Sequence, residues 1–332
     1  MPDNPIFDLS FVIPAFNEEK NIAPLVRRIK KIMSVSNKSY ELIIIDNGSF
    51  DSTPEVLNEL IQENEMLVVL TLNRNFGYEG AIGAGFEHVR GKKVFVMDGD
   101  QQDPPEVIPE FIGKSEEGYE IVYGIRKTRT ESRIIALLIK IFYRIIIRVT
   151  SFDIPKDAGN FGIVDRNVVD IINKMPERNK FLRGLRAWTG FKSTGIVYKR
   201  EQRVEGKSKF SFTAYVNHAI NGITSFTTAP LRIFTYLGAS GICLSFLYGL
   251  FLFLTKFFEL LGYRLLNYNI VGGSTTISLL ILCVISINFL AFGILGEYIG
   301  RIFEEVKQRP SYILRNIRYG SNPEKIMCDL KK

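Results

Sequence analysis

Cysteine and histidine are scarce in this chain, which has three cysteines and two histidines among 332 residues. Cys243 and Cys283 lie inside long apolar runs, so we expect apolar packing and no disulfide framework. His88 and His218 lie far apart in the sequence, which excludes a multi-histidine zinc site and argues against a Ser-His-Asp triad. The N-terminal segment "MPDNPIFDLS" lacks an apolar stretch, and we therefore expect no secretory signal.

Charge is only moderately unbalanced, with 42 Lys and Arg against 35 Asp and Glu, giving a formal net charge of +7. A basic excess favours anionic partners, such as nucleic acid, anionic lipid or phosphorylated small molecules. No recognised nucleic-acid-binding motif is present in the sequence. We therefore expect membrane lipid and phosphate-bearing small molecules as partners, and no nucleic acid.

Two long apolar runs, Ile233–Thr255 and Ile270–Gly296, contain no charged residue. Each exceeds the roughly 20 residues that cross a bilayer core. A buried core helix is the alternative for either run alone, but two neighbouring runs predict a transmembrane hairpin. Basic residues gather on both outer flanks, whereas the predicted tip carries only Lys256 and Arg264. The positive-inside rule then predicts a multi-pass protein of the cytoplasmic (inner) membrane with both termini and the preceding domain in the cytoplasm.

Two further segments are amphipathic. Within residues 133–149, Arg133, Lys140, Arg144 and Arg148 share one stripe of a helix whose other positions are almost wholly apolar. This pattern predicts a helix in the membrane interface; a core helix with a solvated basic edge is the alternative. The organisation we expect is a cytosolic domain over 1–210, a juxtamembrane helix over 211–230, two transmembrane helices over 231–300 and a basic cytosolic tail over 301–332.

The first half of the chain alternates short apolar runs with helical patterns. Strands are predicted at 9–14, 41–46, 67–72 and 93–97, and helices at 18–33, 54–62, 79–89 and 105–114. Strands that are apolar throughout indicate a parallel sheet that is covered on both faces. The predicted fold class is therefore α/β.

Polar residues follow each predicted strand, where ligands of such sheets bind. They are Asn17, Asp46, Asp51, Arg74, Asp98 and Asp100. Asp98 and Asp100 flank Gly99 at the end of the fourth strand, and Gln102 follows two residues later. Carboxylate and carbonyl oxygens suit Mg²⁺ or Mn²⁺, which commonly also bind substrate phosphates. Capping of the turn around Gly48 is the alternative reading of Asp46 and Asp51.

Seven motifs occur in a fixed order: "FVIPAFNEE", "IIIDNGSFDST", "LNRNFG", "MDGDQQDPP", "DAGNFGIVDR", "FLRGLRAWTGF" and "RVEGKSKF". Over about residues 9–210 the chain resembles the polyprenyl-phosphate glycosyltransferases, the membrane-attached branch of family 2 glycosyltransferases related to dolichol-phosphate mannose synthase. The resemblance implies a GT-A fold, a nucleotide-sugar donor, a divalent metal, and inverting transfer of the sugar to a lipid phosphate.

The resemblance also implies residue roles. The nucleotide sugar would be lined by Pro14, Ala15, Asn17, Glu18, Asp46, Arg74 and Asp98. The metal would be held by Asp100 and Gln102, and the catalytic set would be Asp100, Asp157 and Arg126. Asp157 would orient the acceptor or act as base, with a loop cap as the alternative. The lipid phosphate and the diphosphate would be bound by Arg126, Arg129, Arg133, Arg203, Ser208 and Lys209. Asn47 departs from the family's common D-D-G-S.

The expected reaction is transfer of glucose from UDP-glucose to undecaprenyl phosphate at the cytoplasmic membrane face, with Mg²⁺ or Mn²⁺ as cofactor. GDP-mannose, UDP-N-acetylglucosamine and UDP-aminoarabinose remain alternative donors. A processive polysaccharide synthase is the nearest enzymatic alternative, and a membrane scaffold that binds nucleotide is the non-enzymatic one. Two short spans per chain favour a homo-oligomer.

Overall fold

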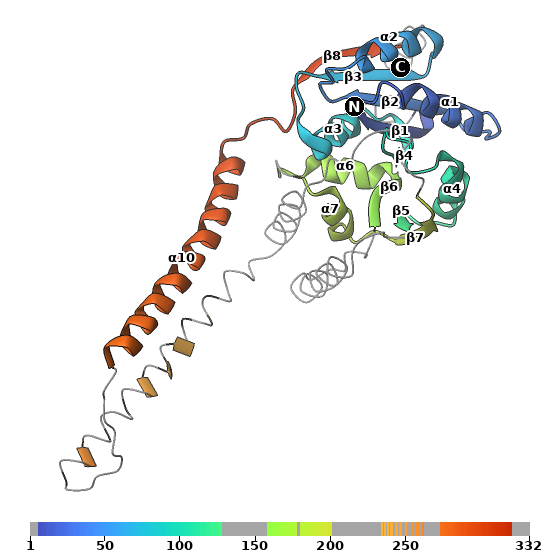
Figure 1. Ribbon diagram of the computed structural model, residues 1–332. Helices are drawn as coiled ribbons and strands as arrows, with labels where there is room; N and C mark the ends of the chain where they lie inside the picture. The colour runs from blue at the N-terminus through green and yellow to red at the C-terminus, as the bar shows by residue number, and fades with distance from the viewer. Residues whose placement is uncertain are drawn as a thin grey trace. The chain divides into compact units, whose positions relative to one another are not determined.

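The computed structural model describes residues 6–127, 158–177, 180–200 and 273–320, with single positions between 234 and 261. It divides into two compact units, one formed by Met1–Gly222 with Gln308–Lys332 and the other by Ile223–Lys307. Figure 1 shows the described elements of both units along the chain. The four-part organisation expected from the sequence remains a prediction.

The first unit is built on an eight-stranded sheet with the order β7-β5-β6-β4-β1-β2-β3-β8. The bounds are β1 Phe7–Ala15, β2 Tyr40–Asp46, β3 Leu67–Leu72, β4 Gly91–Val96, β5 Ile121–Arg126, β6 Ala158–Asp165, β7 Ser193–Tyr198 and β8 Leu314–Tyr319. The four strands predicted from apolar runs are thus β1 to β4, and they are neighbours in the order 4-1-2-3.

Most of the sheet is parallel. β1 pairs in parallel with β2 and β4, β2 with β3, and β5 with β7. β6 and β8 run antiparallel to their neighbours. Ala15 lies opposite Asp46, so the carboxyl ends of β1 and β2 are level. This architecture confirms the predicted α/β class with a mostly parallel sheet, as expected of a GT-A domain.

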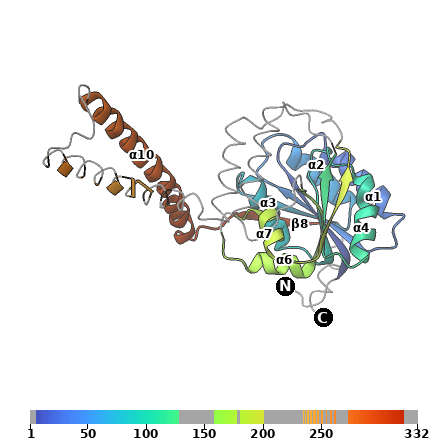
Figure 2. The ribbon, with the colours of Figure 1, turned by 90° about the horizontal axis from the view of Figure 1, so that it is seen from below.

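Helices cover both faces of the sheet (Figure 2). They are α1 Ile22–Met33, α2 Thr53–Glu63, α3 Gly77–Phe86, α4 Ile108–Glu116, α6 Arg166–Lys174 and α7 Leu182–Trp188, with a short 3₁₀ helix, η1, at Pro105–Val107. One core lies beneath α1, α2 and α4, where Phe11, Phe95, Phe111 and Phe161 pack with ring centroids 5.2 to 5.6 Å apart. α3, α6 and α7 cover the opposite face.

The sequence dictates these elements through the spacing of apolar residues. In α1, Ile22, Leu25, Val26, Ile29 and Met33 are buried, a spacing that places them on one face of a helix. In β2, both faces are buried because helices cover both sides, so the strand is apolar almost throughout. Burial of these runs fixes where each strand ends, and hence where the polar residues that follow are placed.

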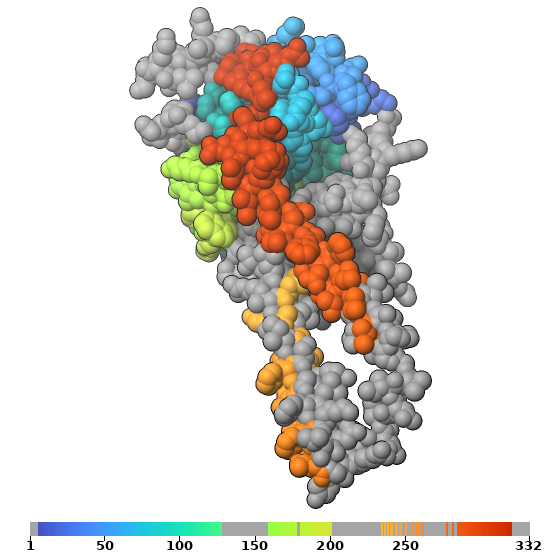
Figure 3. Space-filling view, turned by 90° about the vertical axis from the view of Figure 1, so that its left-hand side faces the viewer, coloured from blue at the N-terminus to red at the C-terminus, as the bar shows by residue number. Residues whose placement is uncertain are grey.

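The strand β8 was not predicted, since the sequence analysis assigned this segment to a basic tail. It pairs antiparallel with β3 at one edge of the sheet. The backbone N–H of Asn73 donates to the carbonyl of Ile313 at 2.9 Å, and that of Gly320 donates to Leu67 at 2.8 Å. Figure 3 shows this red C-terminal strand beside the cyan and blue N-terminal segments. The segment after residue 307 therefore belongs to the first unit.

The described part of the second unit is dominated by α10, Gly273–Val306. Among the described residues, Val284–Val306 is the one helical stretch long and apolar enough to cross a membrane, and no part of it is buried. It overlaps the second predicted span. The first predicted span, Ile233–Thr255, is described only at single positions. The hairpin and the multi-pass topology therefore stay predictions, and the amphipathic segments 133–149 and 211–230 lie outside the described residues.

Candidate active site

The candidate site lies at the edge of the sheet where β1 to β4 end. β5 and β7 run in the same direction, and the antiparallel β6 begins at this edge. The polar residues predicted from separate strand ends are therefore brought to one side of the sheet, as expected for parallel α/β proteins. β5 adds Arg126, β6 adds the Gly159–Asn160 segment, and β7 is followed by Arg200.

The loops after β1 and β2 brace one another. Asn17 has a left-handed backbone with φ of 56°, and its N–H donates to Ser49 Oγ at 3.0 Å while its Oδ1 accepts from the N–H of Phe50 at 3.0 Å. Asp46, only 1% exposed, accepts from the N–H of Ser49 at 2.9 Å. Asp51 accepts from the N–H of Thr53 at 3.0 Å. Turn capping, the alternative reading of Asp46 and Asp51, is thus present.

The backbone N–H of Glu18 also contributes to this bracing. It donates to Thr53 Oγ1 at 2.8 Å, and the Oε2 of the same residue accepts from Asn21 Nδ2 at 2.6 Å. The neighbouring carboxylate of Glu19 accepts from the N–H of Ser52 at 3.0 Å. The two loops therefore form a pre-organised wall of the site.

Asn47 links the end of β2 to the loop between β3 and α3. Its Nδ2 donates to the carbonyl of Gly77 at 3.0 Å and to Asn75 Oδ1 at 3.2 Å, and its Oδ1 accepts from the N–H of Phe76 at 2.9 Å. Each side of the amide thus meets a partner of the matching kind. Arg74, from the same loop, is exposed and lies over the ring of Phe76 at 4.1 Å.

The segment Asp98-Gly99-Asp100 packs closely against the end of β1. A Cβ on Gly99 would lie 3.1 Å from the carbonyl oxygen of Pro14, so glycine permits this approach. Asp98 Oδ1 accepts a 2.6 Å hydrogen bond from the hydroxyl of Tyr78. Asp100, 9% exposed, accepts from the N–H of Gln102 at 3.1 Å.

The Asp98 carboxyl is electrostatically crowded. Burial, followed by the nearby carboxylates of Asp103 and Asp100, raises the pKa of Asp98 to about 6. Among the described residues, no three His, Cys, Asp or Glu side chains are grouped to hold a metal ion. Magnesium often binds through one or two carboxylates plus substrate phosphates. Asp98 and Asp100 therefore fit a cation that is also bound by a substrate phosphate, rather than one bound by protein ligands alone. The positive charge of the cation would relieve the repulsion between the two carboxylates.

Two arginines stand beside these carboxylates. Arg200 Nε lies 3.2 Å from Asp103 Oδ1, and its Nη2 lies 3.8 Å from Asp98 Oδ2. Asp103 is fully buried and also accepts a 2.6 Å hydrogen bond from the hydroxyl of Tyr198. Burial lowers the pKa of Arg126, but Asp103, Tyr198 and Asp98 together raise it above its ordinary value. Arg126 therefore keeps its positive charge at the site.

Arg186 of α7 holds the first residues of β6 in place. Arg186 is 6% exposed, and its Nη2 donates to the carbonyl of Gly159 at 2.7 Å. Burial, with Arg183 nearby, lowers the pKa of Arg186 to about 10. Glu79 lies near the guanidinium group of Arg186. Burial raises the pKa of Glu79 to about 7, although Arg183, Asn160 and Arg186 each act to lower it.

The structure thus brings together the predicted residues of β1, β2, β4 and β5. It also reveals residues that the predicted set omitted, namely Tyr78, Glu79, Asp103, Arg186, Tyr198 and Arg200. The motif "DGDQQDPP" contained a signal for Asp103, a third aspartate in a short acidic segment. Six predicted residues lie outside the described part of the chain: Arg129, Arg133, Asp157, Arg203, Ser208 and Lys209. The roles assigned to all these residues remain predictions.

Known proteins resemble this chain over most of its length. A glycosyltransferase of Synechocystis, described as uncharacterized, is 38% identical, with 93% of this chain and 95% of the relative covered. The bactoprenol glucosyl transferase of Shigella phage SfV is 36% identical, covering 93% and 98%. Among solved structures, glucosyl-3-phosphoglycerate synthase from Mycobacterium tuberculosis with Mn²⁺, UDP-glucose and phosphoglyceric acid is 19% identical, covering 66% and 79%, with a TM-score of 0.44.

A family model matches the part of the chain that supplies most of the site. The model for glycosyl transferase family 2 matches residues 10–171, which span β1 to β6 and their loops. Together with relatives of 36 to 38% identity over almost the whole chain, this match settles the family. The chain belongs to glycosyltransferase family 2, and it is a glycosyltransferase.

Proposed function

We propose that this enzyme transfers glucose from UDP-glucose to a polyprenyl phosphate, undecaprenyl phosphate, with inversion at the sugar. The names of relatives such as the bactoprenol glucosyl transferase of Shigella phage SfV support the acceptor and the sugar. The observation that carries the proposal is the juxtaposition of Asp98 and Asp100 with Arg126 and Arg200 at one sheet edge. Carboxylates for a cation beside guanidinium groups for phosphates suit a reaction between a diphosphate and a phosphate.

In this proposal, Asp100 and Gln102 hold Mg²⁺ or Mn²⁺, with Asp98 beside them. A divalent cation bound there stabilises the negative charge of a departing nucleoside diphosphate. The braced loops after β1 and β2 provide a rigid wall for the nucleoside, because Asn17 and Asp46 fix Ser49 and Phe50. A rigid wall lowers the entropy lost when the donor is positioned.

The acceptor needs little activation. A phosphate monoester has a second pKa near 6, so it is largely dianionic at neutral pH. The harder task is to bring two anions together, and Arg126 at the end of β5 is placed to neutralise them. Asp157 immediately precedes β6 in sequence, and we propose that it orients the acceptor. The other residues of the predicted phosphate-binding set would assist: Arg129, Arg133, Arg203, Ser208 and Lys209.

The long apolar part of α10 supports a location at the membrane, where a polyprenyl acceptor resides. We propose the multi-pass topology with the catalytic unit on the cytoplasmic side, and a homo-oligomeric state, as the sequence analysis predicts. GDP-mannose, UDP-N-acetylglucosamine and UDP-aminoarabinose are the competing donors.

A donor panel tests the proposal. The purified full-length protein, supplied with undecaprenyl phosphate, Mg²⁺ or Mn²⁺ and each nucleotide sugar in turn, should yield a lipid product with the mass of one added hexose from UDP-glucose. Chelation of the cation and the variant Asp100→Ala should both abolish the product. Asp170→Ala, which removes a partly exposed aspartate of α6, should leave it unchanged. Product from another donor only would refute the assignment of glucose, and full activity of Asp100→Ala would refute the metal site.

A further inference from the structure

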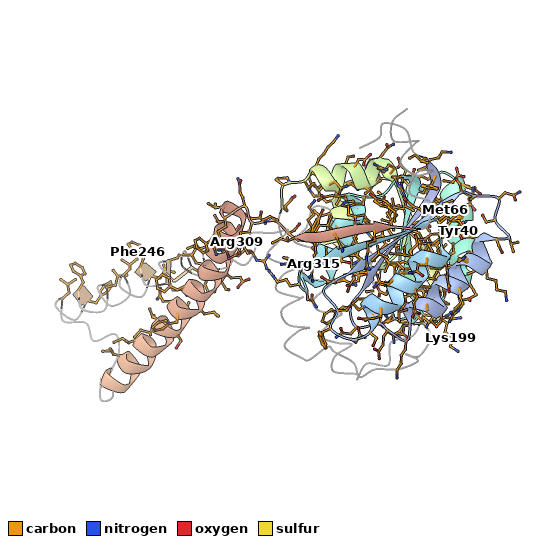
Figure 4. All side chains as sticks on the ribbon, turned by 90° about the horizontal axis from the view of Figure 1, so that it is seen from above. Tyr40, Met66, Lys199, Phe246, Arg309 and Arg315 are labelled. Carbon is orange, nitrogen blue, oxygen red and sulfur yellow. The ribbon has the colours of Figure 1, made fainter. Side chains whose placement is uncertain are left out.

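The residues after β7 bring an arginine into the site that the predicted phosphate-binding set omits. Lys199 is exposed at the outer surface of the unit (Figure 4). Tyr198 and Arg200 on either side of it instead contact Asp103. Alternation of this kind is usual in an extended chain. The side chain of Arg200 is 27% exposed and reaches both Asp98 and Asp103 of the segment after β4.

Asp103 is an anchor and not a ligand for substrate. Its side chain is fully buried, and Oδ1 accepts hydrogen bonds from the hydroxyl of Tyr198 and from Arg200 Nε. Its Oδ2 has no hydrogen-bond partner among the described residues. A buried carboxylate is costly unless cations face it, and Arg126 and Arg200 do so among the residues that the structure describes. Asp103 therefore holds the guanidinium group of Arg200 after β7 and attracts that of Arg126 at the end of β5.

Arg200 retains donors that the anchor does not use. Asp103 engages Nε, while Nη2 lies 3.8 Å from Asp98 Oδ2, which is longer than a hydrogen bond. A guanidinium group has five N–H donors in a planar fork that matches phosphate oxygens. The fork is thus held at Nε by Asp103, and its Nη2 lies on the side of Asp98.

We propose that Arg200 binds a phosphate group of the substrates, and that Asp103 is the positioning residue that holds it. The inference rests on the proposed function and adds a phosphate ligand to that site. The phosphate belongs either to the donor diphosphate or to the lipid acceptor, and the two arms of the test distinguish these sources. The competing role for Arg200 is that of a counter-ion for Asp98 with no contact to substrate.

The first arm measures UDP binding to the full-length protein in detergent with Mg²⁺ by calorimetry, and the second measures the KM for undecaprenyl phosphate. The variants are Arg200→Ala and Arg200→Lys, and the control is Arg27→Ala, an exposed arginine of α1. We expect Arg200→Ala to raise the UDP Kd or the acceptor KM by about tenfold or more, since a charge-assisted hydrogen bond is lost. Arg200→Lys should recover only part of the loss, because an ammonium group lacks the planar fork.

Each outcome decides the proposal. A change confined to UDP assigns the donor diphosphate, and a change confined to the acceptor KM assigns the lipid phosphate. Values within twofold of wild type in both arms for Arg200→Ala overturn the proposal. The UDP arm needs no transfer: if wild type binds UDP but glucosylates nothing, the proposed function fails while the effect of Arg200→Ala on UDP still tests this inference.

A double-mutant cycle tests whether Asp103 acts through Arg200. In the wild-type background, Asp103→Asn should raise the same constant that Arg200→Ala raises, either the UDP Kd or the acceptor KM. In the Arg200→Ala background, Asp103→Asn should leave that constant unchanged. A merely structural role of Asp103 would instead give additive losses in the two backgrounds, which would refute the positioning role. Thermal unfolding of each variant, measured alongside, confirms that the affinities refer to folded protein.

Discussion

Asn47→Asp exchanges one side-chain nitrogen for oxygen and so tests the bridge between β2 and the loop that leads to α3. The amide of Asn47 is only 4% exposed. It donates to the carbonyl of Gly77 and to Asn75 Oδ1, and both partners are acceptors. A carboxylate at this position loses both donated bonds and faces two oxygens. The bond from the N–H of Phe76 would remain.

The expected cost follows from these contacts. A buried polar group left without its partner costs about 1–3 kcal/mol, so we expect Asn47→Asp to lower the free energy of unfolding by about 2 kcal/mol at pH 8. For a domain of this size, that corresponds to a fall of roughly 4–8 °C in Tm. Because the loop leads into α3, where Tyr78 donates to Asp98, UDP binding should also weaken.

The pH dependence has a definite sign. A carboxyl surrounded by acceptors has a raised pKa in the folded state, and its protonated form can donate a hydrogen bond. The loss of stability should therefore be full at pH 8 and should shrink as the pH falls through this raised pKa. Asn73→Asp, the same change at an exposed position of the same loop, is the matched control and should leave Tm unchanged. Equal Tm values for Asn47→Asp and wild type at pH 8 would refute the reasoning.

Two further changes test other parts of the unit. Glu79 has a pKa raised from 4.5 to about 7, so wild type should lose stability as the pH rises from 4.5 through 7, whereas Glu79→Gln, which stays neutral, should remove this slope from Tm measured against pH. Parallel curves for the two proteins would contradict the burial of an ionisable Glu79. Gly320→Ala should lower Tm sharply, because a Cβ there would overlap the carbonyl of Asn64, while Gly83→Ala, whose Cβ would meet nothing within 4 Å, should not. A Tm for Gly320→Ala equal to that of Gly83→Ala would show that the end of β8 is not packed on the sheet.

The strands of the first half were predictable because each is a continuous apolar run. The predicted segment 67–72 coincides with β3, and 41–46 lies within β2. Burial on both faces removes the polar residues that would otherwise blur such a pattern. The search for continuous apolar runs did not find β8, which has the sequence "LRNIRY". An edge strand pairs with a neighbouring strand on one side only and tolerates basic residues. The pairing of β8 with β3 is a contact between distant parts of the chain, which local periodicity does not encode.

The site was predictable to the extent that it depends on strand ends. Parallel strands must deliver Asp46 and Asp98 to one edge, whatever the exact loops do. The cluster of Asp103, Tyr198 and Arg200 was not predictable in this way, because it joins residues almost 100 positions apart from two separate strands. The strand order β7-β5-β6-β4, which is set by packing across the whole sheet, brings the segment after β4 and the end of β7 to the same edge.

The geometry also separates polar residues that looked equivalent in the sequence into two groups with different roles. Asn17, Asp46 and Asp51 place side-chain oxygens on backbone N–H groups of the neighbouring loops, so much of their hydrogen-bonding capacity shapes the wall of the site. The opposite half of the edge contains Asp98, crowded by other carboxylates, and Arg200, whose Nε is anchored by Asp103. Positively and negatively charged side chains without a closely bonded partner of opposite charge are costly in a folded protein. They are retained where a bound ligand supplies that partner. We therefore expect the chemistry to be concentrated on the side of β4, β5 and β7, with the loops after β1 and β2 serving mainly to hold the donor in place.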